Sequence, residues 1–90
     1  MSYVTTPDRP ATSLERLAMC IYAAYVLNEL PEAMIDIISS YFGKNWIQMI
    51  EDKLRLKHKK DLVYARIHRY RASGLNIHDI GYRLATKFIR

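Results

Sequence analysis

The residues with the most evident chemistry lie in residues 57–71, the stretch KHKKDLVYARIHRYR. Lysine, arginine and histidine are concentrated here, and Asp61 is the only acid of the stretch. Cationic side chains repeated about once per helical turn can reach successive phosphates of a nucleic acid, and a tyrosine among them adds a hydroxyl or a stacking surface. The stretch therefore predicts a polyanionic partner.

Charge is divided unequally between the two halves of the chain. Residues 1–54 hold four cations and seven acids, a net charge of −3, whereas residues 55–90 hold ten cations and two acids, a net charge of +8. Such concentration costs self-repulsion, which a polyanionic partner would relieve. The alternative is a basic surface that contacts only solvent.

A helical wheel separates the basic stretch into flanks. At 100° per residue, five side chains share a sector of about 80°: Lys57, Lys60, Tyr64, His68 and Arg71. Arg66 and Arg69 lie on the opposite flank, and an apolar stripe formed by Val63, Ile67 and Tyr70 lies between the two. We therefore expect one side of this helix to be buried while its cations stay accessible.

The prediction is a regulatory or architectural protein that binds nucleic acid, DNA in preference to RNA, mainly through phosphates. Tyr64 or Tyr82 could stack on bases if the nucleic acid is single-stranded. The candidate binding residues are Lys57, Lys59, Lys60, Tyr64, Arg66, His68, Arg69, Arg71, Arg83, Lys87 and Arg90. The alternative function is a protein-interaction module, an adaptor or an inhibitor, whose basic face docks on an acidic protein.

The elements that must position these residues are helices. Glycine and proline are scarce, three of each, and apolar residues recur at helical spacing, so we expect an all-α bundle of four to five helices. The expected segments are residues 13–28, 31–42, 46–54, 61–72 and 77–90, preceded by a flexible arm over residues 1–12. Residues 13–54 would form an apolar and acidic half and residues 55–90 a basic half of one domain, 13–90.

Side chains that can bond to free backbone amides mark the helix starts. Thr12 and Glu15 have the spacing of a capping box, and Asn76 precedes the last segment as an N-cap would. Asn45, together with Gln48, is expected to cap the third segment. The apolar stripes on either side of residues 56–60 are out of phase. Either the chain breaks there, with Asp61 capping the fourth segment, or one long helix is buried on different sides at its two ends; we favour the break.

The last two segments resemble the helix-turn-helix motif of DNA-binding proteins. Gly74 lies in the turn, and Leu75 and Ile80 occupy positions that the motif buries. Arg69 and Tyr70 depart from it, because the motif has apolar and small residues there. An ordinary antiparallel helical hairpin is the alternative.

A second resemblance lies at residues 30–42, LPEAMIDIISSYF, which is similar to the opening of an F-box. The Leu-Pro start and the apolar residues Ile35, Ile38 and Phe42 carry the likeness. It implies a segment that docks on an adaptor of a ubiquitin ligase. The following residues, GKNWIQMIEDK, do not continue the family pattern.

The first helical segment is apolar nearly all round, which suits either the centre of a bundle or an interface. Small domains gain much from association, so we expect a homodimer formed through residues 13–28 and 31–42. The candidate oligomer-interface residues are Leu17, Ile21, Tyr22, Tyr25 and Val26.

Several classes of site are not expected. Cys20 is the single cysteine, so no internal disulfide can form, and His58, His68 and His78 do not have the spacing of metal ligands. No phosphate loop, paired carboxylates or nucleophile–base spacing is present, and we therefore expect no catalysis, cofactor or metal. The longest uncharged run, residues 17–28, is too short to cross a bilayer, and we expect a cytoplasmic, nucleoid or nuclear protein that is not secreted.

Overall fold

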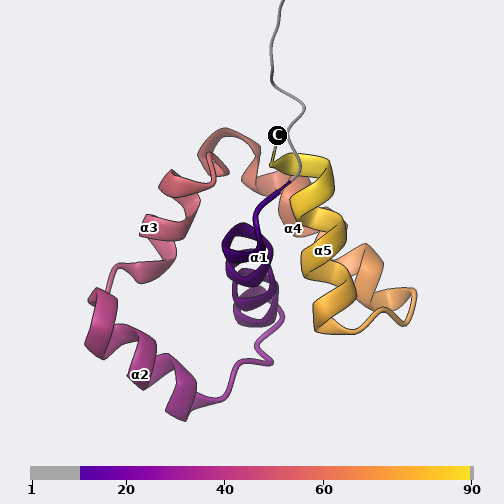
Figure 1. Cartoon of the computed structure of the whole chain (residues 1–90). Coiled ribbons are helices and arrows are strands. Elements are labelled where there is room, and N and C mark those ends of the chain that lie inside the picture. Colours follow the sequence, from indigo (N-terminus) through magenta and orange to yellow (C-terminus); the bar gives the residue numbers. More distant parts are fainter. Residues whose placement is uncertain (1–10, 90) are drawn as a thin grey trace, which may run out of the picture.

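The computed structural model describes residues 11–89, and these residues are helical with short connections (Figure 1). The helices are α1 (Ser13–Val26), α2 (Glu32–Phe42), α3 (Trp46–Lys53), α4 (Lys60–Ala72) and α5 (Ile77–Phe88). One turn of 3-10 helix, η2 (Lys57–Lys59), precedes α4. Since no strand occurs between residues 11 and 89, the predicted all-helical bundle is confirmed. Most of the expected N-terminal arm lies outside the described residues.

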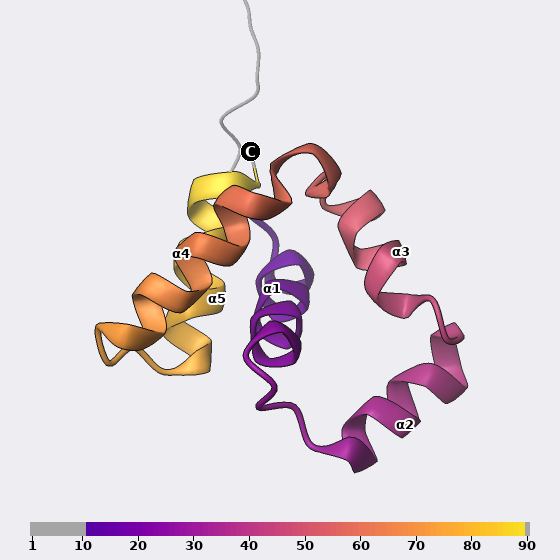
Figure 2. The same ribbon diagram turned by 180° about the vertical axis from the view of Figure 1, so that it is seen from behind.

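The core forms where α1 meets α4 and α5, which lie beside it in both views (Figures 1 and 2). The buried side chains of this core include Met19, Tyr22, Ala23, Val63, Ile67, Ile80, Leu84 and Ala85. Helices α1 and α5 approach each other closely at Gly81, where an added Cβ would lie 2.8 Å from the Cα of Cys20. The absence of a side chain at Gly81 therefore sets the distance between the two helices.

Helices α2 and α3 form an arc that leaves the end of α1 and returns to the start of α4 (Figure 2). Trp46 anchors α3, because its buried ring meets the ring of Tyr25 edge-on at a centroid distance of 5.2 Å. Helix α2 packs on α3 and has no buried residue. Consequently α2 contributes little to the core.

Two of the four predicted side-chain caps form. The Thr12 hydroxyl accepts from the Glu15 amide at 3.1 Å while Glu15 Oε1 accepts from the Thr12 amide at 2.8 Å, which completes the capping box. Asn76 Oδ1 accepts from the Asp79 amide at 2.9 Å. Asn45 is the N-cap residue of α3, which begins at Trp46 as predicted, but its side chain makes no capping bond. The prediction for Asp61 is wrong, because Asp61 lies inside the first turn of α4.

The break between α3 and α4 begins earlier than expected. Helix α3 ends at Lys53, and Arg55 adopts a φ of 57°. Leu54 and Leu56 are both buried, with 8% and 0% of their surface exposed. Residues two apart on a helix face nearly opposite directions, so the chain must leave the helix to bury both leucines.

Helices α4 and α5 form an antiparallel hairpin. Lys59, at the start of α4, donates from Nζ to the carbonyl of Phe88, the last residue of α5, at 3.0 Å. The two helices therefore meet at their far ends as well as at the turn, whereas those of a helix-turn-helix cross at about 90–120°. The antiparallel-hairpin alternative describes this part of the chain better, although Ile80 is buried as the motif would require.

Candidate nucleic-acid interface

Five residues are predicted to share one sector of the basic helix: Lys57, Lys60, Tyr64, His68 and Arg71. Three of them form ion pairs with acids from the first half of the chain. Lys57 lies 3.7 Å from Asp52, Lys60 lies 3.6 Å from Glu51, and Arg71 lies 3.0 Å from Glu29. We call these three cations, Lys57, Lys60 and Arg71, the inner basic flank. Their charge is largely compensated within the chain.

Glu51 is the centre of a buried contact on this flank. It is 6% exposed, and its Oε2 accepts a hydrogen bond of 2.8 Å from the hydroxyl of Tyr22, which is wholly buried. Burial, and after it the hydrogen bond to Glu51, raise the pKa of Tyr22 far above its ordinary range. Tyr64 lies against the Tyr22 ring at a centroid distance of 6.1 Å. Lys60 and Tyr64 thus help to join α4 to α1 and α3.

Arg71 and Lys59 also satisfy backbone groups. Arg71 donates from Nη1 to the carbonyl of Leu75 at 3.1 Å, so it links the α4–α5 turn to Glu29 in the connection after α1. Lys59, bonded to the Phe88 carbonyl, places a cation at the C-terminus of α5, where the helix dipole is negative. Both side chains have structural roles.

The opposite flank of α4 carries cations without acidic partners. Arg66 and Arg69 lie about 120–180° around α4 from Lys60 and Arg71, and therefore face away from α1 and α3. Arg69 is exposed, and the Arg66 guanidinium lies 5.9 Å from the centroid of the Tyr70 ring. Within residues 11–89, neither lies within ion-pair distance of a carboxylate.

Helix α5 adds two cations on the same side of the hairpin. Its α1-facing side is fixed by Gly81, beside Cys20, and by Tyr82, whose ring lies 5.3 Å from the Arg16 guanidinium. Arg83 and Lys87 lie about 150–170° around α5 from that side. Both are exposed, and no ion pair joins Arg83 to Asp79 one turn earlier.

We call Arg66, Arg69, Arg83 and Lys87 the outer basic face. These four cations come from two antiparallel helices, point away from α1 and have no acidic partner in the described part of the chain. Their long side chains alternate with the rings of Tyr70 and Phe88, the latter 6.0 Å from Lys87 Nζ. This face can neutralise phosphates without first breaking an internal ion pair.

The remaining predicted binding residues are placed differently. His68 is exposed on α4, Tyr82 is 56% exposed beside Arg16, and Arg90 lies outside the described residues. Among residues 11–89, no three of the His, Cys, Asp and Glu side chains gather as a metal site would require.

The predicted oligomer interface needs a correction at Tyr22, which the chain itself buries completely. Leu17 and Tyr25 are 53% and 43% exposed, and Ile21 and Val26 are half-buried. The sequence-based prediction missed Tyr41, which at 81% is the most exposed large apolar side chain among residues 11–89. Tyr41 belongs to an apolar stripe of regular helical spacing, which indicates burial, but α2 has no buried residue.

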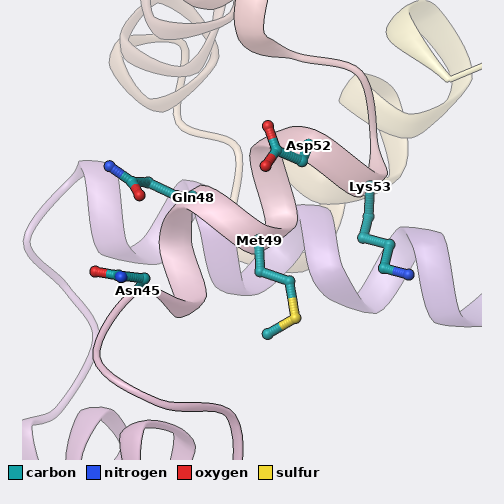
Figure 3. A pocket seen from close by; sticks show the side chains of 5 residues that line it. All are labelled: Asn45, Gln48, Met49, Asp52 and Lys53. Carbon is teal, nitrogen blue, oxygen red and sulfur yellow. The ribbon is translucent and has the colours of Figure 1, made fainter.

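A shallow depression of about 390 Å³ lies on the surface of α3 (Figure 3). Its lining side chains are Asn45, Gln48, Met49, Asp52 and Lys53. Figure 3 shows these side chains pointing in different directions from the helix rather than converging on one point. They contain no nucleophile paired with a base, so the depression offers no catalytic arrangement.

Comparison with protein-family models, with curated proteins and with solved structures finds no match to this chain. The F-box likeness of residues 30–42 therefore rests on its few residues alone. Across residues 11–89, none of the helices is long and apolar enough to cross a membrane.

Proposed function

We propose that this protein binds nucleic acid, DNA in preference to RNA, through the phosphate backbone, as a regulatory or architectural protein. The observation that supports this is the outer basic face, four cations on two helices with no acidic partner in the described chain. Phosphate contacts made by arginine and lysine position a protein on a duplex without reading its sequence. We therefore expect binding with weak sequence preference.

The number of uncompensated cations sets the expected salt dependence. Four phosphate contacts correspond to a slope of about −3.6 in log affinity against log salt, or a loss of roughly 100-fold between 50 and 200 mM. If the inner basic flank also bound phosphates, the slope would be steeper by about 0.9 for each added contact.

A salt titration with random-sequence duplex and single-stranded oligonucleotides, followed by fluorescence anisotropy, tests the proposal. We expect binding at low salt that weakens with the slope of four contacts. Absence of binding to both oligonucleotides at low salt, or binding that does not depend on salt, would overturn it. A clear preference for the single strand would assign a stacking role to Tyr64 or Tyr82.

One observation favours the second candidate, docking on an acidic protein. Leu62 is 65% exposed and lies between Arg66 and Arg69 on the helical wheel of α4. An apolar side chain among cations suits a protein partner, since interface cores combine apolar contacts with arginine. Leu62→Ala separates the two functions, because it should leave nucleic-acid affinity within about twofold, whereas a docked protein would lose an apolar contact.

A further inference from the structure

Two helices expose apolar stripes with the same spacing. On α1 the stripe is Leu14, Leu17 and Ile21, of which the leucines are 75% and 53% exposed. On α2 the stripe is Met34, Ile37 and Tyr41, exposed by 44%, 57% and 81%. Both follow the i, i+3, i+7 pattern of a helix seam that packs against another helix. We call them the α1 stripe and the α2 stripe.

The α1 stripe lies on the far side of α1 from the basic hairpin. Met19 and Ala23, which pack in the core with α4 and α5, are about 180° around α1 from the stripe. Tyr22 faces Glu51 of α3 and Cys20 faces Gly81 of α5, so these two packed sectors lie on either side of the stripe. Tyr25, at the edge of the stripe, meets Trp46 of α3. A partner at this surface would not cover the outer basic face.

The exposed apolar surface is as large as a stable interface needs. The six stripe residues, together with Tyr25 and Phe42 at the helix ends, make eight large apolar side chains. Seven of them are 43–81% exposed, and Ile21 is half-buried. At roughly 200 Å² per large side chain, they amount to about 900 Å² in one copy. Covering them in two copies would bury on the order of 1,800 Å², within the range of stable complexes and beyond what monomers usually expose.

We propose that a second copy of this chain covers both stripes, with α2 of each copy lying on α1 of the other. The two stripes have matching spacing but belong to helices whose main neighbours within one chain differ, α5 for α1 and α3 for α2. A two-fold arrangement lets each copy contribute α1 and α2 once, so that both stripes are covered and the assembly closes.

The charge distribution fits the same arrangement. Leu17 and Ile21 of the α1 stripe lie in the uncharged run of residues 17–28. The half of the chain that joins the copies has a net charge of −3. The halves with a net charge of +8 stay at the two outer ends. Self-association through the stripes thus avoids bringing the most basic surfaces together, whereas association through α4 and α5 would oppose like charges.

Sedimentation equilibrium at micromolar concentration tests the proposal, and the expected result is twice the chain mass. Leu17→Glu and Ile37→Glu should each raise the dissociation constant roughly 30-fold or more, the usual cost of disabling an interface hot spot. Because both side chains are exposed in the single chain, circular dichroism should show unchanged helix content. Leu62→Glu, at an equally exposed leucine on α4, is the matched control and should leave the dimer intact.

Cysteine cross-linking tests the pairing of α1 with α2. Leu17→Cys and Ile37→Cys are prepared separately and mixed, and oxidation should join them only in the mixture. Cys20 is buried in the native chain, so wild-type protein should give no cross-link. A cross-link by Ile37→Cys alone would overturn this pairing, because it would place α2 against α2. A monomeric wild-type protein would overturn the dimer and assign the stripes to a different protein partner.

Discussion

The two flanks of α4 differ in what lies opposite them, although both carry the same kinds of residue. The inner basic flank faces Glu29, which follows α1, and the neighbouring Glu51 and Asp52 of α3, all in the first half of the chain. The outer flank, with Arg66 and Arg69, faces no acid in the described residues. The same basic helix therefore connects the two charge halves of the molecule on one side and leaves its charge uncompensated on the other.

This difference changes what each cation contributes. A cation paired with a carboxylate adds little to the field that attracts a phosphate, and its removal affects mainly the contact that it makes in the fold. A cation without a partner contributes its full charge to the surface potential and little to stability. Substitutions on the two flanks should therefore separate into losses of stability and losses of affinity.

The largest effect is expected from charge reversal on the outer basic face. Arg66→Glu combined with Arg83→Glu should lower affinity for a random duplex more than about 100-fold at low salt, because two attractive contacts become repulsive. Helix content and the urea midpoint should change little, since neither side chain has an ion pair within the part of the chain that the structure describes. Binding within about threefold of wild type would show that the outer face is not the interface.

A loss of stability is expected at the centre of the inner flank. Glu51→Ala should lower the free energy of unfolding by about 2–3 kcal/mol, because the buried Tyr22 hydroxyl loses its acceptor and Lys60 loses its counter-charge. Urea unfolding measures this change. Oligonucleotide affinity should not fall, since Lys60 becomes free.

The matched control is Asp52→Ala, which removes the exposed pair with Lys57. It should cost no more than about 1 kcal/mol. Equal losses for Asp52→Ala and Glu51→Ala would mean that the buried contact has no special role in joining α4 to α3.

The pH dependence of stability should report the same buried contact. The pKa of Tyr22 is raised above its ordinary value of 10.0, so the folded chain keeps this proton where the unfolded chain loses it. Stability from this group is therefore complete below pH 10.0 and is lost as pH rises above it, by about 1.4 kcal/mol per unit while only the unfolded state releases the proton. Urea unfolding between neutral and alkaline pH should show this decline in wild type and less of it in Tyr22→Phe.

The sequence predicted the parts of the fold that depend on near neighbours. The capping box at Thr12, the Asn76 cap and the burial of Val63 and Ile67 all follow from residues within a few positions of one another. The break at Arg55 could not be placed, because it depends on both Leu54 and Leu56 reaching a core built by distant helices.

The division of the candidate site could not be predicted for the same reason. A helical wheel shows that Lys60 and Arg71 share a flank, but it does not show which flank meets Glu51 and Glu29, which are far from them in sequence. Likewise the apolar residues all round α1 do not show which of its faces is packed, and Leu14 is 75% exposed. The packed face of a helix is chosen by its neighbours in space, and several faces of α1 are apolar enough to serve.

The smallest effects give the sharpest comparison, because two arginines of α4 only two residues apart lie on opposite flanks. Arg69→Gln should weaken oligonucleotide binding about fivefold and make the salt slope shallower by about 0.9, with stability unchanged. Arg71→Gln should cost about 0.5–1 kcal/mol of stability, since its pair with Glu29 is partly exposed, and change affinity less than twofold. Equal losses of affinity and equal changes in salt slope for the two variants would contradict the division into two flanks. They would mean that the nucleic acid contacts both flanks of α4 and that pairing with Glu29 does not prevent Arg71 from binding a phosphate.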